Sequence, residues 1–233
     1  MSKKAWIIFA VLTIGIFALL VVCSNSTKVN ISSIDENAIQ VGNAQNGNIA
    51  DHVFGKIDSK VTLIEYGDYQ CPGCGAEHVL VKAILDTYKD KIRYVFRNFP
   101  LTSIHPNAKA ASATVEAAGL QNKYWEMHNK VYEAQSAWVN LLAGERDSLF
   151  TTYAKDLGLD MDKFKTDIVS KEINNKINYD TAIARKLNIN GTPSFYLNGT
   201  AIKGETWGDD AKFRAAIDSE LTKNNIALPK PNN

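Results

Sequence analysis

The chain has 233 residues, of which 45% are hydrophobic and 22% charged, and its formal net charge is +1. This length suits one large domain or two small ones, and the composition is ordinary for a globular protein. The charge is nearly balanced and Lys and Arg are scattered along the chain, so no bulk positive field is available to recruit nucleic acid.

The N-terminus begins with Lys3 and Lys4 and continues as an almost uninterrupted apolar run over residues 5–22. About 18 apolar residues are just enough to cross a bilayer as a helix. Residues 1–23 are therefore predicted to form a cytoplasmic start and a transmembrane signal anchor. By the positive-inside rule the lysines stay in the cytoplasm and the rest of the chain faces outward, where disulfides persist.

This segment has two alternative interpretations, a cleaved signal peptide and a lipidation site at Cys23. The exit of the apolar run has no small-x-small cleavage site, which favours an uncleaved anchor over a cleaved signal peptide. Leu20 stands three residues before Cys23, as in a lipidation motif, although Val22 is bulkier than the residue usual at that place.

A linker is predicted over residues 24–54, since its first part is rich in Ser and Asn and only weakly patterned. Residues 49–54 could add an edge strand. The compact domain is expected at residues 55–228, and residues 229–233 read as a loose tail.

A strand followed by two cysteines organises this domain. Residues 61–66 are strand formers, and residues 75–89 have a helical period. Pro72 suits a first helical turn, so Cys71 is predicted at the helix N-terminus, with Cys74 close enough to form a disulfide with it. The partial positive charge of a helix start stabilises a thiolate. A strand leading into Cys-x-x-Cys at a helix start is typical of a thiol–disulfide exchange site.

The cysteine count supports a working site. The third cysteine, Cys23, falls in the apolar run, so the rest of the chain holds one pair. A disulfide across three residues closes almost no loop and stabilises little. A zinc site is the alternative, but zinc usually takes four ligands and there is no second cysteine pair. A c-type haem would need His after Cys74, where Gly75 stands.

Glu65 lies in the predicted apolar strand. If it is buried beneath the cysteines, burial raises its pKa, and it could exchange a proton with Cys74. The alternative is a Glu65 that faces solvent at a sheet edge.

The remaining elements complete an α/β pattern. Residues 92–99 alternate like a strand, and residues 105–187 carry helical signals almost throughout. Residues 191–199 read as a strand and turn, 201–204 as the returning strand of a hairpin, and 209–223 as a last amphipathic helix.

This order resembles the DsbA-like branch of the thioredoxin superfamily, including its membrane-tethered, BdbD-like members. The resemblance covers roughly residues 55–224. It rests on Glu65 six residues before Cys71 and on two motifs, Cys71-Pro72-Gly73-Cys74 and Gly191-Thr192-Pro193-Ser194-Phe195. It implies a thioredoxin fold with an inserted helical domain at about residues 101–187. It also implies a cis Pro193 facing the cysteines, for which an ordinary turn proline is the alternative.

On this reading Cys71 is the nucleophile and Cys74 the resolving thiol. Thr192 and Pro193, with Pro72 and Gly73, would bind substrate, since backbone groups beside the cysteines can pair with an extended chain by strand addition. The best-known oxidases of the family carry His before the second cysteine, where this chain has Gly73, which puts the strength of oxidation in doubt.

The sequence thus predicts an extracytoplasmic, membrane-tethered dithiol oxidase that acts on exported proteins. It would need no metal and no cofactor beyond the Cys71–Cys74 disulfide, and a quinone-linked membrane protein would re-oxidise it. A disulfide reductase or isomerase of the same fold, or a tethered metal-binding module, are the alternatives.

Overall fold

A computed structural model describes Trp6 and residues 29–230. The chain divides into two compact units, residues 1–30 and 31–233, and the fold below is that of the second. Apart from Trp6, the predicted anchor at residues 5–22 lies outside the described residues, as do Cys23 and the end of the tail. None of the helices in the described part of the chain is long and apolar enough to span a membrane.

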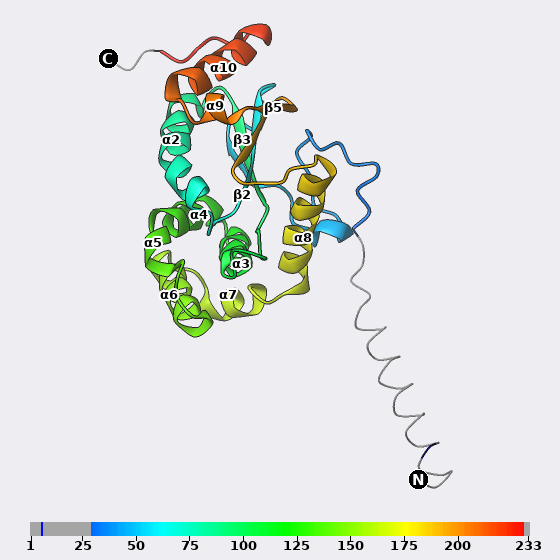
Figure 1. Cartoon of the computed structure of the whole chain (residues 1–233), viewed down its shortest axis with the longest axis vertical. Coiled ribbons are helices and arrows are strands. Elements are labelled where there is room, and N and C mark those ends of the chain that lie inside the picture. The colour runs from blue at the N-terminus through cyan, green and yellow to red at the C-terminus, as the bar shows by residue number, and fades with distance from the viewer. Residues whose placement is uncertain (1–5, 7–28, 231–233) are drawn as a thin grey trace. The chain divides into compact units, whose positions relative to one another are not determined.

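Five strands form one mixed sheet in the order β1-β3-β2-β4-β5. They are β1 (Val53–Gly55), β2 (Thr62–Gly67), β3 (Arg93–Asn98), β4 (Ser194–Leu197) and β5 (Thr200–Ile202). β2 and β3 are parallel, and the other neighbouring pairs are antiparallel. Every residue of the central strand β2 is buried, and helices lie on both sides of the sheet (Figure 1). Burial on both faces explains why β2 reads as an apolar run instead of an alternating one.

Helix α2 (Pro72–Tyr88) connects β2 to β3, and α9 (Gly204–Trp207) and α10 (Asp210–Lys223) follow β5. A group of helices lies between β3 and β4 in the chain: α3 (Ala108–Gly119), α4 (Tyr124–Glu133), α5 (Gln135–Trp138), α6 (Ala143–Asp156), α7 (Met161–Asp167) and α8 (Lys171–Lys186). This group occupies the segment expected as a helical insertion, and α8 returns along the sheet (Figure 1). The predicted α/β class is confirmed.

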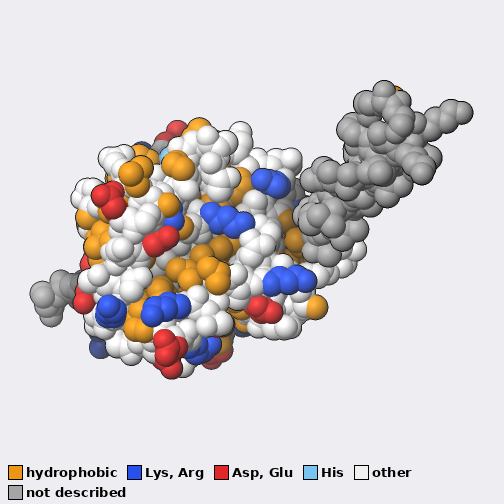
Figure 2. All heavy atoms as spheres, turned by 90° about the horizontal axis from the view of Figure 1, so that it is seen from below, with side chains coloured by type: hydrophobic (Ala, Val, Ile, Leu, Met, Phe, Trp, Pro, Cys, Tyr) orange, Lys and Arg blue, Asp and Glu red, His pale blue; other side chains and the backbone are white. Residues whose placement is uncertain are grey.

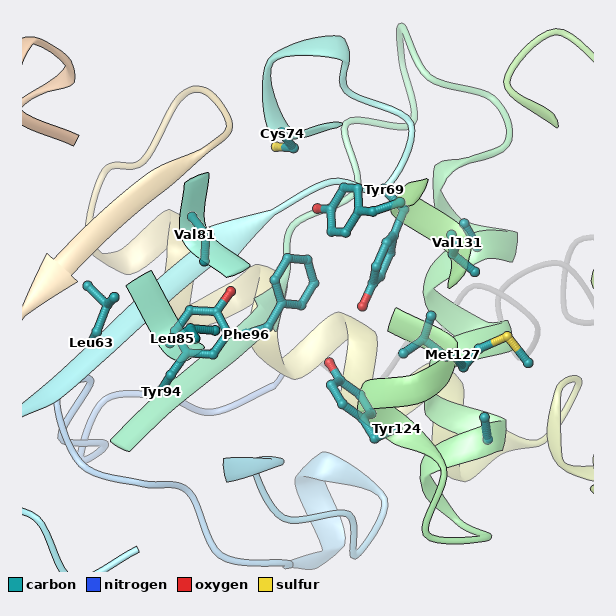
Figure 3. Close-up of a cluster of buried hydrophobic side chains, with 14 of the residues drawn as sticks. Leu63, Tyr69, Cys74, Val81, Leu85, Tyr94, Phe96, Tyr124, Met127 and Val131 are labelled. Carbon is teal, nitrogen blue, oxygen red and sulfur yellow. The ribbon is translucent and has the colours of Figure 1, made fainter. Parts of the chain in front are cut away.

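The main hydrophobic core runs from the sheet and α2 into the inserted helices. Figure 3 shows Tyr94 and Phe96 of β3 between side chains of α2 and of α4, with Cys74 at the edge of the same cluster. The resolving cysteine of the sequence prediction is therefore placed against the core. On the face seen in Figure 2, Lys and Arg side chains are interspersed with acidic and hydrophobic ones and form no continuous basic surface.

The residues expected as a linker belong largely to the compact unit, which begins at Ile31 and not near residue 55. Asp51, whose side chain is fully buried, lies 2.8 Å from Arg97 of β3 and 2.8 Å from Lys176 of α8. Arg97 also donates to the Ala38 carbonyl over 2.7 Å. Polar composition suggested a loose segment, but these polar groups have buried partners far away in the chain, which local patterning cannot show.

Candidate active site

The local sequence explains where the two cysteines lie. Cys71 is the N-cap of α2 and Pro72 takes the first helical turn, where a missing N–H costs nothing. The Cys71 N–H donates to the Asp68 carbonyl over 3.0 Å, which turns the chain from β2 into the helix. Both cysteines are free thiols. Cys71 is 9% exposed and Cys74, one turn further into the helix, 1%, so Cys71 is the more accessible sulfur.

The two thiols differ in acidity. The pKa of Cys71 falls to about 5, chiefly because the Cys74 thiol donates a hydrogen bond to the Cys71 sulfur. Partial burial raises the Cys71 pKa, whereas the Thr192 side chain and the backbone N–H groups of Cys74 and Gly73 lower it further. The pKa of Cys74 is raised well above its usual value by burial, by the same hydrogen bond, and by the nearby charges of Glu65 and Cys71. These shifts favour a thiolate at Cys71 and a thiol at Cys74 near neutral pH.

Glu65 lies inside the protein and not at a solvent-facing edge. It is 4% exposed on the central strand β2. Burial raises its pKa to about 8, although the hydrogen bond from Tyr94 works in the opposite direction. The charge of Glu65 helps to raise the pKa of Cys74, which makes Glu65 a candidate proton donor and acceptor for the buried thiol.

The loop before β4 completes the site. The Thr192–Pro193 peptide bond is cis. The Thr192 carbonyl oxygen lies 3.3 Å from the Cys71 sulfur, 121 residues away in the chain, and accepts its hydrogen bond when Cys71 is a thiol. A side-chain carbon added at Gly73 would lie 3.6 Å from Pro193 and 3.7 Å from the Cys71 sulfur. The loop of Thr192 and Pro193 therefore meets the start of α2 at Cys71 and Gly73. Pro72 and Gly73 are exposed at this place.

A groove borders this loop. It has a volume of about 430 Å³ and runs past Thr192 and Pro193 toward Tyr196, Ile202 and Trp207. Its mixed aromatic and backbone lining suits an extended peptide segment.

Several supporting residues were not identified from the sequence. Asp68 is fully buried below the cysteine loop, and its carboxylate accepts from the Leu101 N–H over 2.8 Å and lies 2.7 Å from His105. His52 lies 3.0 Å from Glu116, and His128 lies 2.9 Å from the Tyr69 hydroxyl. Their partners are 59 or more residues away, so no local signal could identify these contacts.

Among Trp6 and residues 29–230, no group of three or more His, Cys, Asp or Glu side chains is arranged to hold a metal ion.

Known proteins provide a comparison for this geometry. A thioredoxin family model matches residues 47–219. A probable disulfide bond formation protein D of Bacillus anthracis is 32% identical over 173 residues, which cover 73% of this chain and 78% of that protein. A Na(+)/H(+) antiporter, NhaA 1 of Salinispora arenicola, is 38% identical over 150 residues, or 64% of this chain and 22% of the antiporter. The matched part of this chain spans about a quarter of the length of the NhaA antiporters that it resembles.

Solved structures agree with the fold. BdbD from Bacillus subtilis in its oxidised form superposes with a TM-score of 0.65 at 22% identity, covering 79% of this chain and 98% of BdbD. A thioredoxin-like oxidoreductase from Silicibacter pomeroyi superposes with a TM-score of 0.61 at 25% identity, covering 74% of this chain and 92% of that one. The likeness to BdbD is one of fold.

Proposed function

Because the chain belongs to the DsbA-like branch of the thioredoxin superfamily, we propose that it is a thiol–disulfide oxidoreductase whose redox site is the Cys71–Cys74 pair. One observation carries the proposal: two adjacent thiols at a helix start, one accessible with a pKa of about 5 and the other buried with a raised pKa. Such a difference suits an attacking or leaving sulfur paired with a resolving one.

The proposed reaction begins with the Cys71–Cys74 disulfide. A substrate thiolate attacks the Cys71 sulfur, the bond between the cysteines breaks, and Cys74 leaves as a thiolate that takes a proton from Glu65. A second substrate thiolate then attacks the substrate sulfur of the mixed disulfide and releases Cys71 as a thiolate. The substrate gains a disulfide, and its two electrons remain on the reduced cysteine pair.

The direction we propose is oxidation of the substrate. A low pKa makes Cys71 a good leaving group and stabilises the reduced enzyme, and both effects favour donation of the disulfide. The hydrogen bond from Cys74 and the surrounding backbone N–H groups supply this stabilisation without a histidine at position 73. These donors therefore stabilise the Cys71 thiolate although Gly73 stands where the best-known oxidases of the family have a histidine.

For the substrate we propose an extended, unfolded segment of an exported protein. It would lie in the groove beside Thr192 and Pro193, where backbone groups adjoin Cys71. Main-chain pairing accepts many sequences, as an enzyme with varied clients needs.

The cellular setting is a further part of the proposal. The apolar run at residues 5–22 behind Lys3 and Lys4 supports a membrane tether with the domain outside the cytoplasm. A quinone-linked membrane protein would then re-oxidise the cysteine pair. Protease added to spheroplasts should digest the domain, and a domain shown to be intact and cytoplasmic would contradict this setting.

The decisive experiment follows the purified protein with a reduced, unfolded client. Cys71→Ser should abolish disulfide formation in this client. When the client is instead supplied with its disulfide already formed, Cys71 of the Cys74→Ser variant should attack it and accumulate a mixed disulfide, because the Cys74 thiol that would displace the client is missing. Equal trapping by both variants would contradict the assigned roles. In cells, a pair that is mainly oxidised supports the oxidase, and a pair kept reduced would favour a reductase.

A further inference from the structure

Helix α5 of the inserted segment reaches the cysteine loop through one side chain. The Gln135 amide nitrogen donates to the Tyr69 carbonyl over 2.8 Å and to the Cys71 carbonyl over 2.9 Å. A side-chain amide has two N–H donors, so both are used. The Cys71 carbonyl also accepts the Gly75 N–H of α2 over 3.1 Å. Gln135 therefore ties the residue that carries the accessible thiol to an element 64 residues away.

Helix α5, which carries Gln135, is anchored in the protein interior by Trp138. Trp138, at the other end of α5, is fully buried and donates to the Val131 carbonyl over 2.9 Å. Its ring packs edge-on against Phe150, with centroids 5.3 Å apart. The cysteine loop has a second tie to this region, since the Gln70 amide donates to the Val139 carbonyl over 2.8 Å.

The approach of Gln135 depends on the glycine after Cys74. A side-chain carbon added at Gly75 would lie 2.6 Å from the Gln135 amide carbon and 2.8 Å from its nitrogen. Real side-chain carbons essentially never come this close, so the amide would have to move. Gly75 lies within α2, where alanine is the better helix former. A glycine here therefore weakens the helix locally but leaves the space that Gln135 occupies.

We propose that Gln135 is a positioning residue for thiol–disulfide exchange: through the gap left by Gly75, its amide fixes the Cys71 backbone at the start of α2. The inference rests on the proposed function of Cys71 as the reacting thiol. With the Cys71 carbonyl held, its sulfur stays beside the Cys74 thiol and the N–H groups of Gly73 and Cys74. The inserted helices thereby help to set the redox balance of a site on the thioredoxin core.

The test is a double-mutant cycle on the reduced full-length protein with Gln135→Ala, Gly75→Ala and the double variant. Thiolate absorbance against pH gives the pKa of Cys71, and equilibration with glutathione gives the redox equilibrium constant. Each single variant should raise the Cys71 pKa and shift the equilibrium by about threefold or more toward the disulfide form, since a less stabilised thiolate makes the reduced form less favourable.

The cycle has a distinctive expected outcome. In the Gln135→Ala background, Gly75→Ala should shift neither quantity further and should increase stability, because alanine favours the helix and no amide is left to displace. Additive effects of the two changes, or single variants with an unchanged pKa and equilibrium, would overturn the proposal.

Two more variants separate hydrogen bonding from packing. Gln135→Met keeps the length of the side chain and removes its donors, so it should behave like Gln135→Ala; a wild-type pKa in this variant would overturn the proposal. Gln121 is a matched control, since it also bridges backbone groups, here those of Asp160. Gln121→Met should leave the Cys71 pKa unchanged, and an equal shift from it would count against a specific role of Gln135.

The failure of this inference differs from failure of the proposed function. Wild-type protein that cannot exchange thiols would contradict the function, while the cycle on the Cys71 pKa could still succeed. Wild-type protein that exchanges normally, with no pKa shift in the variants, would contradict the positioning role alone.

Discussion

Tyr94 donates a 2.6 Å hydrogen bond to Glu65 across the parallel strands β3 and β2. Both side chains are buried, and this hydrogen bond lowers the Glu65 pKa against the larger, opposite effect of burial. The resulting pKa of about 8 keeps Glu65 largely protonated at neutral pH but close to the point of titration. A group poised in this way can both give and take a proton during turnover.

Glu65→Gln should change the pH dependence of stability. In the folded protein Glu65 titrates at about 8 instead of 4.5, so the folded state binds more protons than the unfolded state between these pH values. The wild type therefore loses stability as pH rises through that window, and Gln removes this loss. We expect the variant to be more stable by about 1–3 kcal/mol at pH 8 and above, after allowing for a new buried amide donor without a partner.

Urea unfolding from pH 4 to pH 9 measures this effect. The difference between variant and wild type should shrink toward zero, or reverse, as pH falls to about 4.5. A constant difference across the range would mean that Glu65 does not titrate in this window.

Glu65→Gln should also slow the reverse of the first step, in which Cys74 attacks Cys71 in a mixed disulfide and releases the substrate thiol, because the buried Cys74 thiol loses its proton acceptor. The second step, in which a substrate thiolate releases Cys71, should change little. Stopped-flow kinetics of the two half-reactions against pH can separate them. An unchanged resolving step with an unchanged pH profile would remove Glu65 from the site.

The Cys71 thiolate should be visible in alkylation kinetics. In a Cys23→Ser background, the rate of Cys71 with iodoacetamide should reach half its maximum near pH 5, the pKa of this thiol. The Cys71 pKa is lower in the folded protein than in the unfolded chain, so ionisation of Cys71 stabilises the folded, reduced protein. This contribution is complete at pH values above the unfolded pKa and is lost as pH falls through about 5. Cys74→Ala should move the midpoint upward, since the Cys74 thiol is the main hydrogen-bond donor to Cys71. A midpoint unchanged by Cys74→Ala would contradict that cause.

Gly73→His should raise the reduction potential. A side-chain carbon fits at this exposed position, with ordinary contacts of 3.6 Å to Pro193 and 3.7 Å to the Cys71 sulfur. A histidine there adds a donor and partial positive charge beside the thiolate, so the Cys71 pKa should fall and the potential should rise by about 30 mV or more. Glutathione equilibria measure this, with Gly73→Ala as the control for the loss of glycine. Equal potentials for the His and Ala variants would mean that this residue does not set the redox balance here.

Asp51→Asn should measure how much the contacts of residues 31–54 contribute to the stability of the folded domain. Asp51 is fully buried between Arg97 and Lys176, and removing its charge leaves the buried Arg97 without its carboxylate partner, while Lys176 keeps Asp180 at 2.7 Å. We expect a loss of about 3–5 kcal/mol in urea unfolding. Asp86→Asn, which removes an exposed partner 3.9 Å from Lys82, should change stability by at most about 0.5 kcal/mol. Similar small effects for both variants would show that the segment contributes little.

The sequence by itself determined the parts of this protein that depend on near neighbours. The strand before Cys71, the helix that begins at Pro72 and the run of helices before β4 all follow from local periodicity and from proline chemistry. The cysteine pair was evident for the same reason, because a three-residue spacing at a helix start is itself the signal.

Only the tertiary structure decided which distant groups surround that pair. Glu65 was ambiguous in the sequence because alternation gives a face of a strand but not what covers it, and the structure buries it beside Tyr94. Gln135 carried no signal at all, since its role depends on a contact with Cys71 and on the empty space at Gly75. The segment before β1 read as a linker because its polar residues have no local partners, and folding supplies them from Arg97 and Lys176.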